Sequence, residues 1–365
     1  MSLANVKPGA FVRTKGHVRR PSALLVVSSL ILFLSLAVIL ATTVGAAGIP
    51  FSRLPAALGL AAPSPGDAFH ARDQLILWSI RLPRIAVAAM IGGILGAAGA
   101  IMQGLFRNPL ADPALVGVSS GGAFAAASAI VISDSRFAVH IQFLQPMLLP
   151  LAAFLGSLLT TVILYRIATR SGRTSIAIFL LAGLAIAAIA NAGIGLLVFV
   201  ADDRQLRDIT FWLLGSLSGA TWSKAMTIVP VFALASIVMI FIHRGLDMLI
   251  LGESEAFHSG IDVERLKRIC IVVISAMTGV AVSVCGVIGF VGIVVPHLLR
   301  LMIGPGHRLL LPASVALGAM MLVGADTLAR TIVAPAEMPI GILTAAVGAP
   351  IFLLILLRQR GLVGL

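Results

Sequence analysis

The sequence predicts an all-α polytopic membrane protein that crosses the bilayer ten times, with both termini on the cytoplasmic side. Three observations support this fold class. Hydrophobic residues make up 59% of 365 positions and charged residues only 11%, whereas soluble domains are about one quarter charged. Apolar runs of about 20 residues, the length that spans a bilayer as a helix, recur along the chain. Lysine and arginine collect in alternate gaps between these runs.

The predicted spans follow one another with short connections. The apolar stretch 269–299 is too long for one crossing, and "GFVG" and Pro296 predict that it divides into a span and a shorter broken helix. The ten predicted spans are 23–45, 85–106, 114–132, 146–165, 176–200, 225–242, 269–288, 289–303, 309–329 and 340–357.

The distribution of positive charge sets the orientation. With the N-terminus inside, 17 of the 26 lysines and arginines face the cytoplasm, as the positive-inside bias requires. This bias also explains the net charge of +12 without a nucleic-acid partner. The first apolar segment is too long for a signal-peptide core, so it is expected to remain as a span.

The chain is expected to form one domain. A cytoplasmic tail at 1–22 precedes a ten-helix transmembrane domain at 23–358, and a second cytoplasmic tail follows at 359–365. The stretch 209–222 is apolar but too short to cross, and predicts a helix at the outer interface anchored by Trp212 and Trp222.

The sequence shows no convincing catalytic motif. It has no GxxxxGK[ST] loop, and no HExxH, GxSxG or carboxylate pair stands in a plausible solvated cleft, so we expect neither an enzyme nor a permanently bound cofactor or metal. Cys270 and Cys285 lie in apolar runs and are expected to pack. His297 is expected to cap or pack rather than to contact haem. Asp326 and Arg330 have the i,i+4 spacing of a structural ion pair.

Two polar segments interrupt the predicted cytoplasmic face. "RNPLADP" at 107–113 predicts a turn that its prolines stiffen, in which Asp112 either offsets Arg107 or caps the next helix. The segment 251–268 contains "ESEAFHSG", which predicts a short helix ending at Gly260. We expect this segment either to be a solvated loop or to dock a soluble partner.

Three arginines fall on the outer side, where positive charge is disfavoured. Arg81 and Arg84 in "RLPR" precede the second span, and Arg330 ends the ninth. They are expected either to contact lipid phosphate or to bind acidic residues of an external partner.

Several motifs, in order, resemble one family. They are "RLPR", "QGLFRNPLADPALVGVSSGGAF", "FWLLGSLSGATW", "LGESEAFHSGI", "IGFVGIVVPHLLR", "ADTLART" and "AEMPIGILTAAVGAPIF". The chain resembles the FecCD-type (type II) permease subunits of ABC importers for iron-siderophores, haem and cobalamin. The resemblance implies a homodimer in the bacterial inner membrane, two copies of a cytoplasmic ATPase that holds ATP and magnesium, and a periplasmic substrate-binding protein.

The resemblance also implies residue roles. Arg81, Arg84 and Arg330 would pair with acidic residues of the binding protein. Asn108, Leu110, Thr174 and Ser175 would form a cytoplasmic gate. The segment inserted in the ATPase would consist of Leu251, Gly252, Glu253, Ser254, Glu255, Ala256, Phe257, His258, Ser259 and Gly260.

The cargo and the energy source have alternatives. "ADTLARTIVAPAEMPIG" looks most like the haem permeases, so haem is the expected cargo, with ferric siderophore or cobalamin as the alternatives. An ion-coupled secondary transporter is the competing class, and the scarcity of carboxylates within the spans disfavours it. A membrane-embedded enzyme is disfavoured because no polar site converges.

Overall fold

The computed structural model describes residues 23–45, 47–63, 67–133 and 145–360. The predicted tail 1–22 and most of the predicted tail 359–365 lie outside these residues. Helices account for nearly all of the elements. In chain order they are α1 (Ala23–Thr43), α2 (Leu54–Ala57), α3 (His70–Leu75), η1 (Ile76–Arg81), α4 (Leu82–Phe106), η2 (Pro113–Val116), α5 (Val118–Ser133), α6 (Gln145–Ala168), β1 (Thr169–Arg170), β2 (Arg173–Thr174), α7 (Ile176–Val200), α8 (Asp203–Leu213), α9 (Trp222–Leu251), α10 (Glu253–His258), α11 (Val263–Cys285), α12 (Val291–Ile303), α13 (His307–Ile332) and α14 (Ile340–Arg360).

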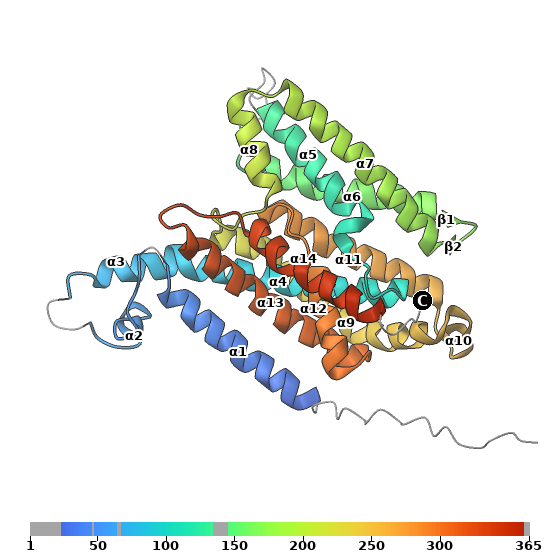
Figure 1. Cartoon of the computed structure of the whole chain (residues 1–365), viewed down its shortest axis with the longest axis horizontal. Coiled ribbons are helices and arrows are strands. Elements are labelled where there is room, and N and C mark those ends of the chain that lie inside the picture. Colours follow the sequence, from blue (N-terminus) through green and yellow to red (C-terminus); the bar gives the residue numbers. More distant parts are fainter. Residues whose placement is uncertain (1–22, 46, 64–66, 134–144, 361–365) are drawn as a thin grey trace, which may run out of the picture.

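The helices form a bundle with two distinct ends. In Figure 1, α4, α9, α11, α12 and α13 lie together, with α5, α6 and α7 on one side of them and α1 on the other. We call the end that contains Arg81, Arg84 and Arg330 the arginine end. The opposite end contains the turn 107–113, the antiparallel pair β1–β2 and α10, and is called the hairpin end.

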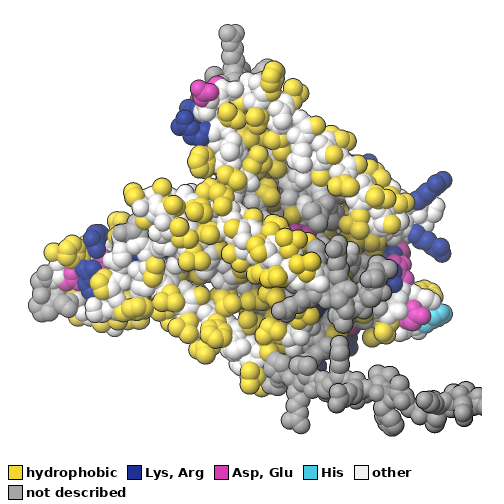
Figure 2. Space-filling view, in the orientation of Figure 1, with side chains coloured by type: hydrophobic (Ala, Val, Ile, Leu, Met, Phe, Trp, Pro, Cys, Tyr) yellow, Lys and Arg dark blue, Asp and Glu magenta, His cyan; other side chains and the backbone are white. Residues whose placement is uncertain are grey.

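The lengths of the helices fit a membrane protein. Among the described residues, seven helices are long and apolar enough to cross a bilayer. Three shorter apolar helices cover 118–133, 291–303 and 340–354. Each predicted span overlaps one of these ten helices. Figure 2 shows charged side chains gathered near the ends of the molecule, with a mostly hydrophobic surface between them on this face.

The second span begins earlier than the sequence predicts. Helical structure runs without interruption from His70 to Phe106 instead of starting at residue 85. Pro83 lacks an N–H group and its ring crowds the preceding turn. The preceding turns form the π-helix η1, and this wider winding lets the helix continue into Pro83 without stopping.

The long apolar stretch divides near the predicted place, but at a different feature. The chain leaves the helix between Gly286 and Phe290, where both residues adopt positive φ. A break at Pro296 is not found, because α12 runs through it. The proline leaves a carbonyl of the previous turn free, and Gln103 Nε2 lies 3.5 Å from the Gly292 oxygen and 3.3 Å from the Ile293 oxygen.

The predicted outer helix exists but is displaced along the sequence. It is α8, which begins at Asp203 rather than at residue 209 because Asp202 and Gln205 form a reciprocal capping box. Trp212 packs against buried side chains of the neighbouring helices. Trp222 instead starts α9, where its indole N–H donates to the Trp78 carbonyl at 2.8 Å.

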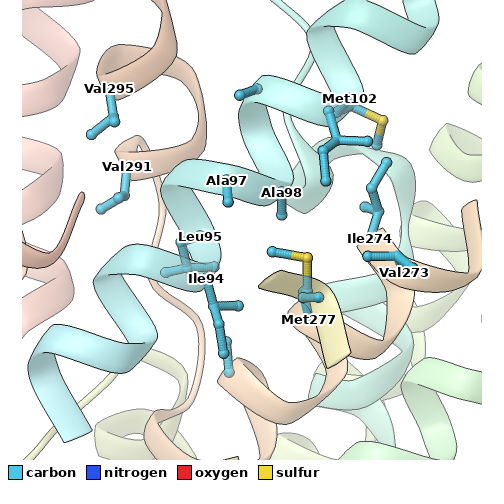
Figure 3. Close-up of a cluster of buried hydrophobic side chains, with 14 of the residues drawn as sticks. Ile94, Leu95, Ala97, Ala98, Met102, Val273, Ile274, Met277, Val291 and Val295 are labelled. Atoms are coloured by element: carbon cyan, nitrogen blue, oxygen red, sulfur yellow. The ribbon is translucent and has the colours of Figure 1, made fainter. Parts of the chain in front are cut away.

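The core is centred on α4. Figure 3 shows side chains of α4, including Ile94 and Met102, packed against α11 and α12. Glycines permit close approach here: a Cβ on Gly99 would lie 1.9 Å from the Gly292 oxygen, and one on Gly92 would lie 2.2 Å from the Gly318 oxygen. These glycines therefore let the helix backbones pack closely, which matters where van der Waals contact holds membrane helices together.

Candidate functional site: the two ends of the bundle

The arginine end contains a buried ion network that joins α4 to α13. Arg84 is only 5% exposed. Its Nε and Nη2 lie 2.9 Å from Asp326 Oδ1, and its Nη1 lies 2.9 Å from Glu337 Oε1. Arg330 Nε lies 3.3 Å from Asp326 Oδ2, which confirms the predicted i,i+4 ion pair. Asp326 therefore serves two arginines, and Glu337 neutralises part of their charge.

The other guanidinium groups bind backbone at the end of α1. Arg81 is buried and donates to the carbonyls of Thr42 and Ala47. Arg330 Nη2 donates to the Ala41 carbonyl at 3.2 Å. The last carbonyl groups of a helix receive no N–H donor from the helix itself, and they carry partial negative charge. Arginine side chains stabilise them by donating hydrogen bonds. The end of α1 is thereby held to η1 and α13.

A docking role for Arg81, Arg84 and Arg330 remains a prediction. All three are at least nine-tenths buried in the single chain, so a partner's carboxylate would have to reach Arg84 through its neighbours. Glu337 has 42% of its side chain exposed and is the accessible acidic member of this network. The sequence did not indicate Glu337, although it lies in the quoted motif "AEMPIG".

At the hairpin end, the turn 107–113 is held by its own polar side chains. Arg107 adopts a left-handed conformation and ends α4. Asn108 Oδ1 accepts from the Leu110 amide at 2.9 Å. Asp112 Oδ1 accepts from the Ala114 amide at 3.0 Å and caps η2, which decides between the two roles predicted for it. Asn108 is exposed and Leu110 is half-buried.

Asp112 is the buried titratable group of this turn. Its side chain is 6% exposed and lies close to Gly292, at the start of α12. Burial raises the pKa of Asp112 from 3.8 to about 6, opposed by the hydrogen bond from Ala114.

The second half of the predicted gate lies at the same end. Ser175 caps α7, accepting from the Ile178 amide at 3.4 Å, and Thr174 ends the β1–β2 hairpin. The rings of Phe106 and Phe179 are 6.2 Å apart, which places the end of α4 beside the start of α7. The described residues show no hydrogen bond between the pair Asn108 and Leu110 and the pair Thr174 and Ser175.

Lys267 connects this hairpin to α10 and α11. It is 3% exposed, and its Nζ lies 2.8 Å from Glu253 Oε2, 3.1 Å from Glu264 Oε1 and 3.2 Å from the Thr174 oxygen. Glu264 Oε2 accepts from the Thr174 amide at 2.9 Å. Lys267 is not among the residues predicted from the sequence, although Glu264, three residues earlier, indicated an ion pair on one helix face.

The segment 251–260 contains the predicted short helix, α10. Gly260 follows it in a left-handed conformation. Ala256 is fully buried, whereas Phe257 is 69% exposed. A groove of about 1090 Å³ runs between α10 and the hairpin. Its lining includes Arg173, Glu253, Ser254, Phe257, Asp262 and Glu264.

The other residues considered from the sequence, two cysteines and a histidine, lie buried among the helices. Cys270 and Cys285 are free and buried, as predicted. His297 is buried in α12. The described residues contain no group of three or more histidine, cysteine, aspartate or glutamate side chains arranged to hold a metal. His307 is held by Asp247 of α9, whose Oδ1 lies 2.8 Å from both its amide nitrogen and Nδ1.

Comparison with known proteins places the whole bundle among transporters. The FecCD transport family matches residues 31–358. The hemin transport system permease protein HmuU of Yersinia pestis is 44% identical over 290 residues, covering 78% of this chain and 84% of that protein. The cobalamin import system permease protein BtuC of Halobacterium salinarum is 44% identical over 287 residues, covering 79% and 74%. A solved metal-chelate type ABC transporter in an inward-facing conformation superposes with a TM-score of 0.78 at 29% identity, covering 92% of this chain and 99% of that one.

Proposed function

The chain belongs to the FecCD transport family, and on this basis we propose that it is the membrane permease of an ATP-driven importer of haem. The observation that carries the proposal is the family match over residues 31–358, which covers nearly every described helix. The sequence has no phosphate-binding loop. ATP and magnesium therefore belong on a separate ATPase, and this chain supplies the path through the inner membrane.

In this proposal the hairpin end faces the cytoplasm and the arginine end faces the periplasm. The positive-inside bias supports this orientation, with both termini inside. The groove beside α10 suits an ATPase partner because it presents the exposed ring of Phe257 next to the charged residues Arg173 and Glu253. Exposed aromatic side chains are typical anchors of protein interfaces.

The gate is proposed to form in a homodimer. Asn108 and Leu110 of each copy would approach the axis, together with Thr174 and Ser175. The stiffness of the turn 107–113 supports this role, because hydrogen bonds to Asn108 and Asp112 fix its backbone. Transport would alternate between a state open to the periplasm and a state open to the cytoplasm, driven by two copies of the ATPase.

Haem is the proposed cargo and cobalamin is the second candidate. A haem permease and a cobalamin permease are both 44% identical to the chain over similar lengths. The resemblance of "ADTLARTIVAPAEMPIG" to the haem permeases is the reason for ranking haem first. Ferric siderophores remain the third class to be compared.

The test is uptake into proteoliposomes. The permease would be reconstituted with its ATPase and with its binding protein outside, and uptake of haem, cobalamin and a ferric siderophore would be measured with ATP or without it inside. ATP-dependent uptake of haem above the other two is expected. Uptake of cobalamin or siderophore but not haem would overturn the cargo, and uptake without the ATPase would instead indicate an ion-coupled transporter.

A further inference from the structure

The junction around Lys267 joins three parts of the hairpin end that are separated in the sequence. Its members are Lys267, Glu253, Glu264 and Thr174. Glu253 begins α10, Glu264 and Lys267 lie in the first turns of α11, and Thr174 immediately precedes the cap of α7. One buried ammonium group therefore contacts the segment proposed to bind the ATPase and the hairpin proposed to border the gate.

The hydrogen bonding of this ammonium group is complete. An ammonium group has three donors, and here each has its own acceptor: Glu253 Oε2, Glu264 Oε1 and the Thr174 carbonyl oxygen. Removing a lysine from water is costly unless its charge is paired and its donors are used. The site therefore accommodates Lys267 only while α10 and the hairpin both stay in place.

Thr174 is held from both sides of its backbone. Its carbonyl accepts from Lys267, and its amide donates to Glu264 Oε2 at 2.9 Å. Because Ser175 is the next residue and caps α7, a shift of Thr174 moves the start of that helix. A shift of α10 by an ångström would lengthen the bond to Glu253 beyond hydrogen-bond distance.

Within α10, Glu253 differs from its neighbours. Ser254, Glu255, Phe257 and His258 are exposed, and within the described part of the chain none of them forms a hydrogen bond or ion pair with Lys267. These side chains can meet a partner while Glu253 contacts the buried lysine. The helix thus has one face for the partner, while Ala256 is buried and Glu253 contacts Lys267 inside the permease.

We propose that Lys267 is a positioning residue that transmits movement of α10 to Thr174 and Ser175 at the gate. This rests on the proposed function, because it requires an ATPase at α10. When ATP moves α10, Glu253 moves with it and displaces the Lys267 ammonium group. Because Lys267 also donates to the Thr174 carbonyl, the hairpin and the start of α7 move as well. Without Lys267 the ATPase still binds and hydrolyses ATP, but its cycle is poorly coupled to the gate.

The first test reads the gate directly and needs no cargo. The full-length permease with Ser175→Cys, assembled with its ATPase, would be labelled with a maleimide in the presence and absence of ATP. Cys270 and Cys285 are buried and free, so they give a low background. We expect ATP to change the labelling rate in the parent protein, and K267M to lower that change about fivefold or more, a usual size for coupling between sites.

Three further variants make the test specific. K267R keeps the positive charge and is expected to retain much of the change. R265M removes an exposed positive charge from the same region of α11, outside the junction, and should behave as the parent. E253Q removes the charge of the α10 acceptor and so weakens its bond to Lys267, which tests the proposal even if K267M does not assemble. Because Glu253 also lies in the segment proposed to bind the ATPase, ATPase binding and hydrolysis by E253Q are measured in parallel. The effects of K267M and E253Q should be non-additive, as for residues in one network.

The second measurement separates the two proposals. Cargo imported per ATP hydrolysed is expected to fall in K267M while ATPase activity is kept. If the parent imports none of the three cargoes, the proposed function fails, and the labelling experiment still decides the role of Lys267. If ATP changes the labelling rate of the parent, and changes that of K267M and of E253Q by the same amount as in the parent, Lys267 does not transmit the movement. A parent whose labelling ignores ATP also overturns the inference.

Discussion

At the scale of single residues, Asp112 shows how burial converts a helix cap into a pH-sensitive group. The folded protein holds this carboxyl away from water next to Gly292, so its proton binds more tightly than in the unfolded chain. A folded pKa above the unfolded value means that stability from this group is greatest when the carboxyl is protonated. That contribution is lost as pH rises from about 4 to about 6.

Replacing Asp112 by asparagine should remove this dependence on pH. An asparagine oxygen can still accept from the Ala114 amide, so the cap is kept. The melting temperature of D112N minus that of the native protein should increase from pH 4 to pH 6 and then stay constant. Thermal unfolding in detergent over this pH range measures the difference. D202N changes an exposed capping aspartate and is the control. A difference that is constant across the range would contradict the raised pKa.

Sequence spacing could predict some residue contacts and not others. The pair of Asp326 and Arg330 follows from i,i+4 geometry on one helix, and the structure contains it. Arg84 and Asp326 are 242 residues apart, so only the packing of α4 against α13 brings them together. Lys267 and Thr174 are likewise joined by tertiary structure, 93 residues apart.

At the scale of elements, the close contact of α4 with α12 depends on residues without side chains. Gly99 and Gly292 let the two backbones approach within a distance that a Cβ would prevent. In a bilayer there is little hydrophobic gain from burying a helix, so such close packing holds the bundle.

Alanine at position 99 should therefore weaken the bundle. Its Cβ would overlap the Gly292 oxygen, and overpacking of this kind costs about 1–3 kcal/mol or more. The melting temperature of G99A in detergent is expected to fall by several degrees. Gly324 in α13 has nothing within 4 Å of the position that a Cβ would take. The G324A protein should therefore be as stable as the native protein, or more stable by up to about 1 kcal/mol. Equal losses in both variants would show that close packing is not the cause.

Apolar runs predicted the existence of the membrane helices better than their ends. The run 85–106 is visible in the sequence, but its extension to His70 is not, because "RLPR" looks like an interruption. That extension depends on the π-helix before Pro83, which no local pattern indicates. Similarly, Pro296 predicted a break that Gln103 makes unnecessary by donating to nearby carbonyls of α12.

At the scale of the whole molecule, the arginine end raises the question of how a partner could bind it. Arg84 already contacts two carboxylates. Replacing it with glutamate would place like charges beside Asp326, so loss of binding in that variant could not be separated from loss of folding. Neutralising Glu337 is a cleaner experiment because this residue is partly exposed.

The variant E337Q should bind the substrate-binding protein more tightly if that protein places a carboxylate on Arg84. It removes a carboxylate that competes for Arg84 and is itself 42% exposed. Taking the upper end of the range for exposed ion pairs, the expected gain is about 1 kcal/mol, or about fivefold in affinity. Biosensor measurements at low and high salt would give the affinity and the on-rate. E255Q neutralises a carboxylate at the opposite end and is the control. Affinity that is unchanged or weaker in E337Q would argue against docking at Arg84.

The distance in sequence between Arg84 and Asp326 also has a consequence for biosynthesis. A ribosome adds about 5–20 residues per second, so roughly 10–50 s pass between the synthesis of α4 and that of the aspartate that pairs with Arg84. Throughout that interval the growing chain carries an arginine whose permanent partner does not yet exist. Its position near the end of a membrane helix lets the side chain extend into water or lipid headgroups while it waits. The network at the arginine end is thus completed only when nearly the entire polypeptide has been made, after α13 and Glu337 have been synthesised.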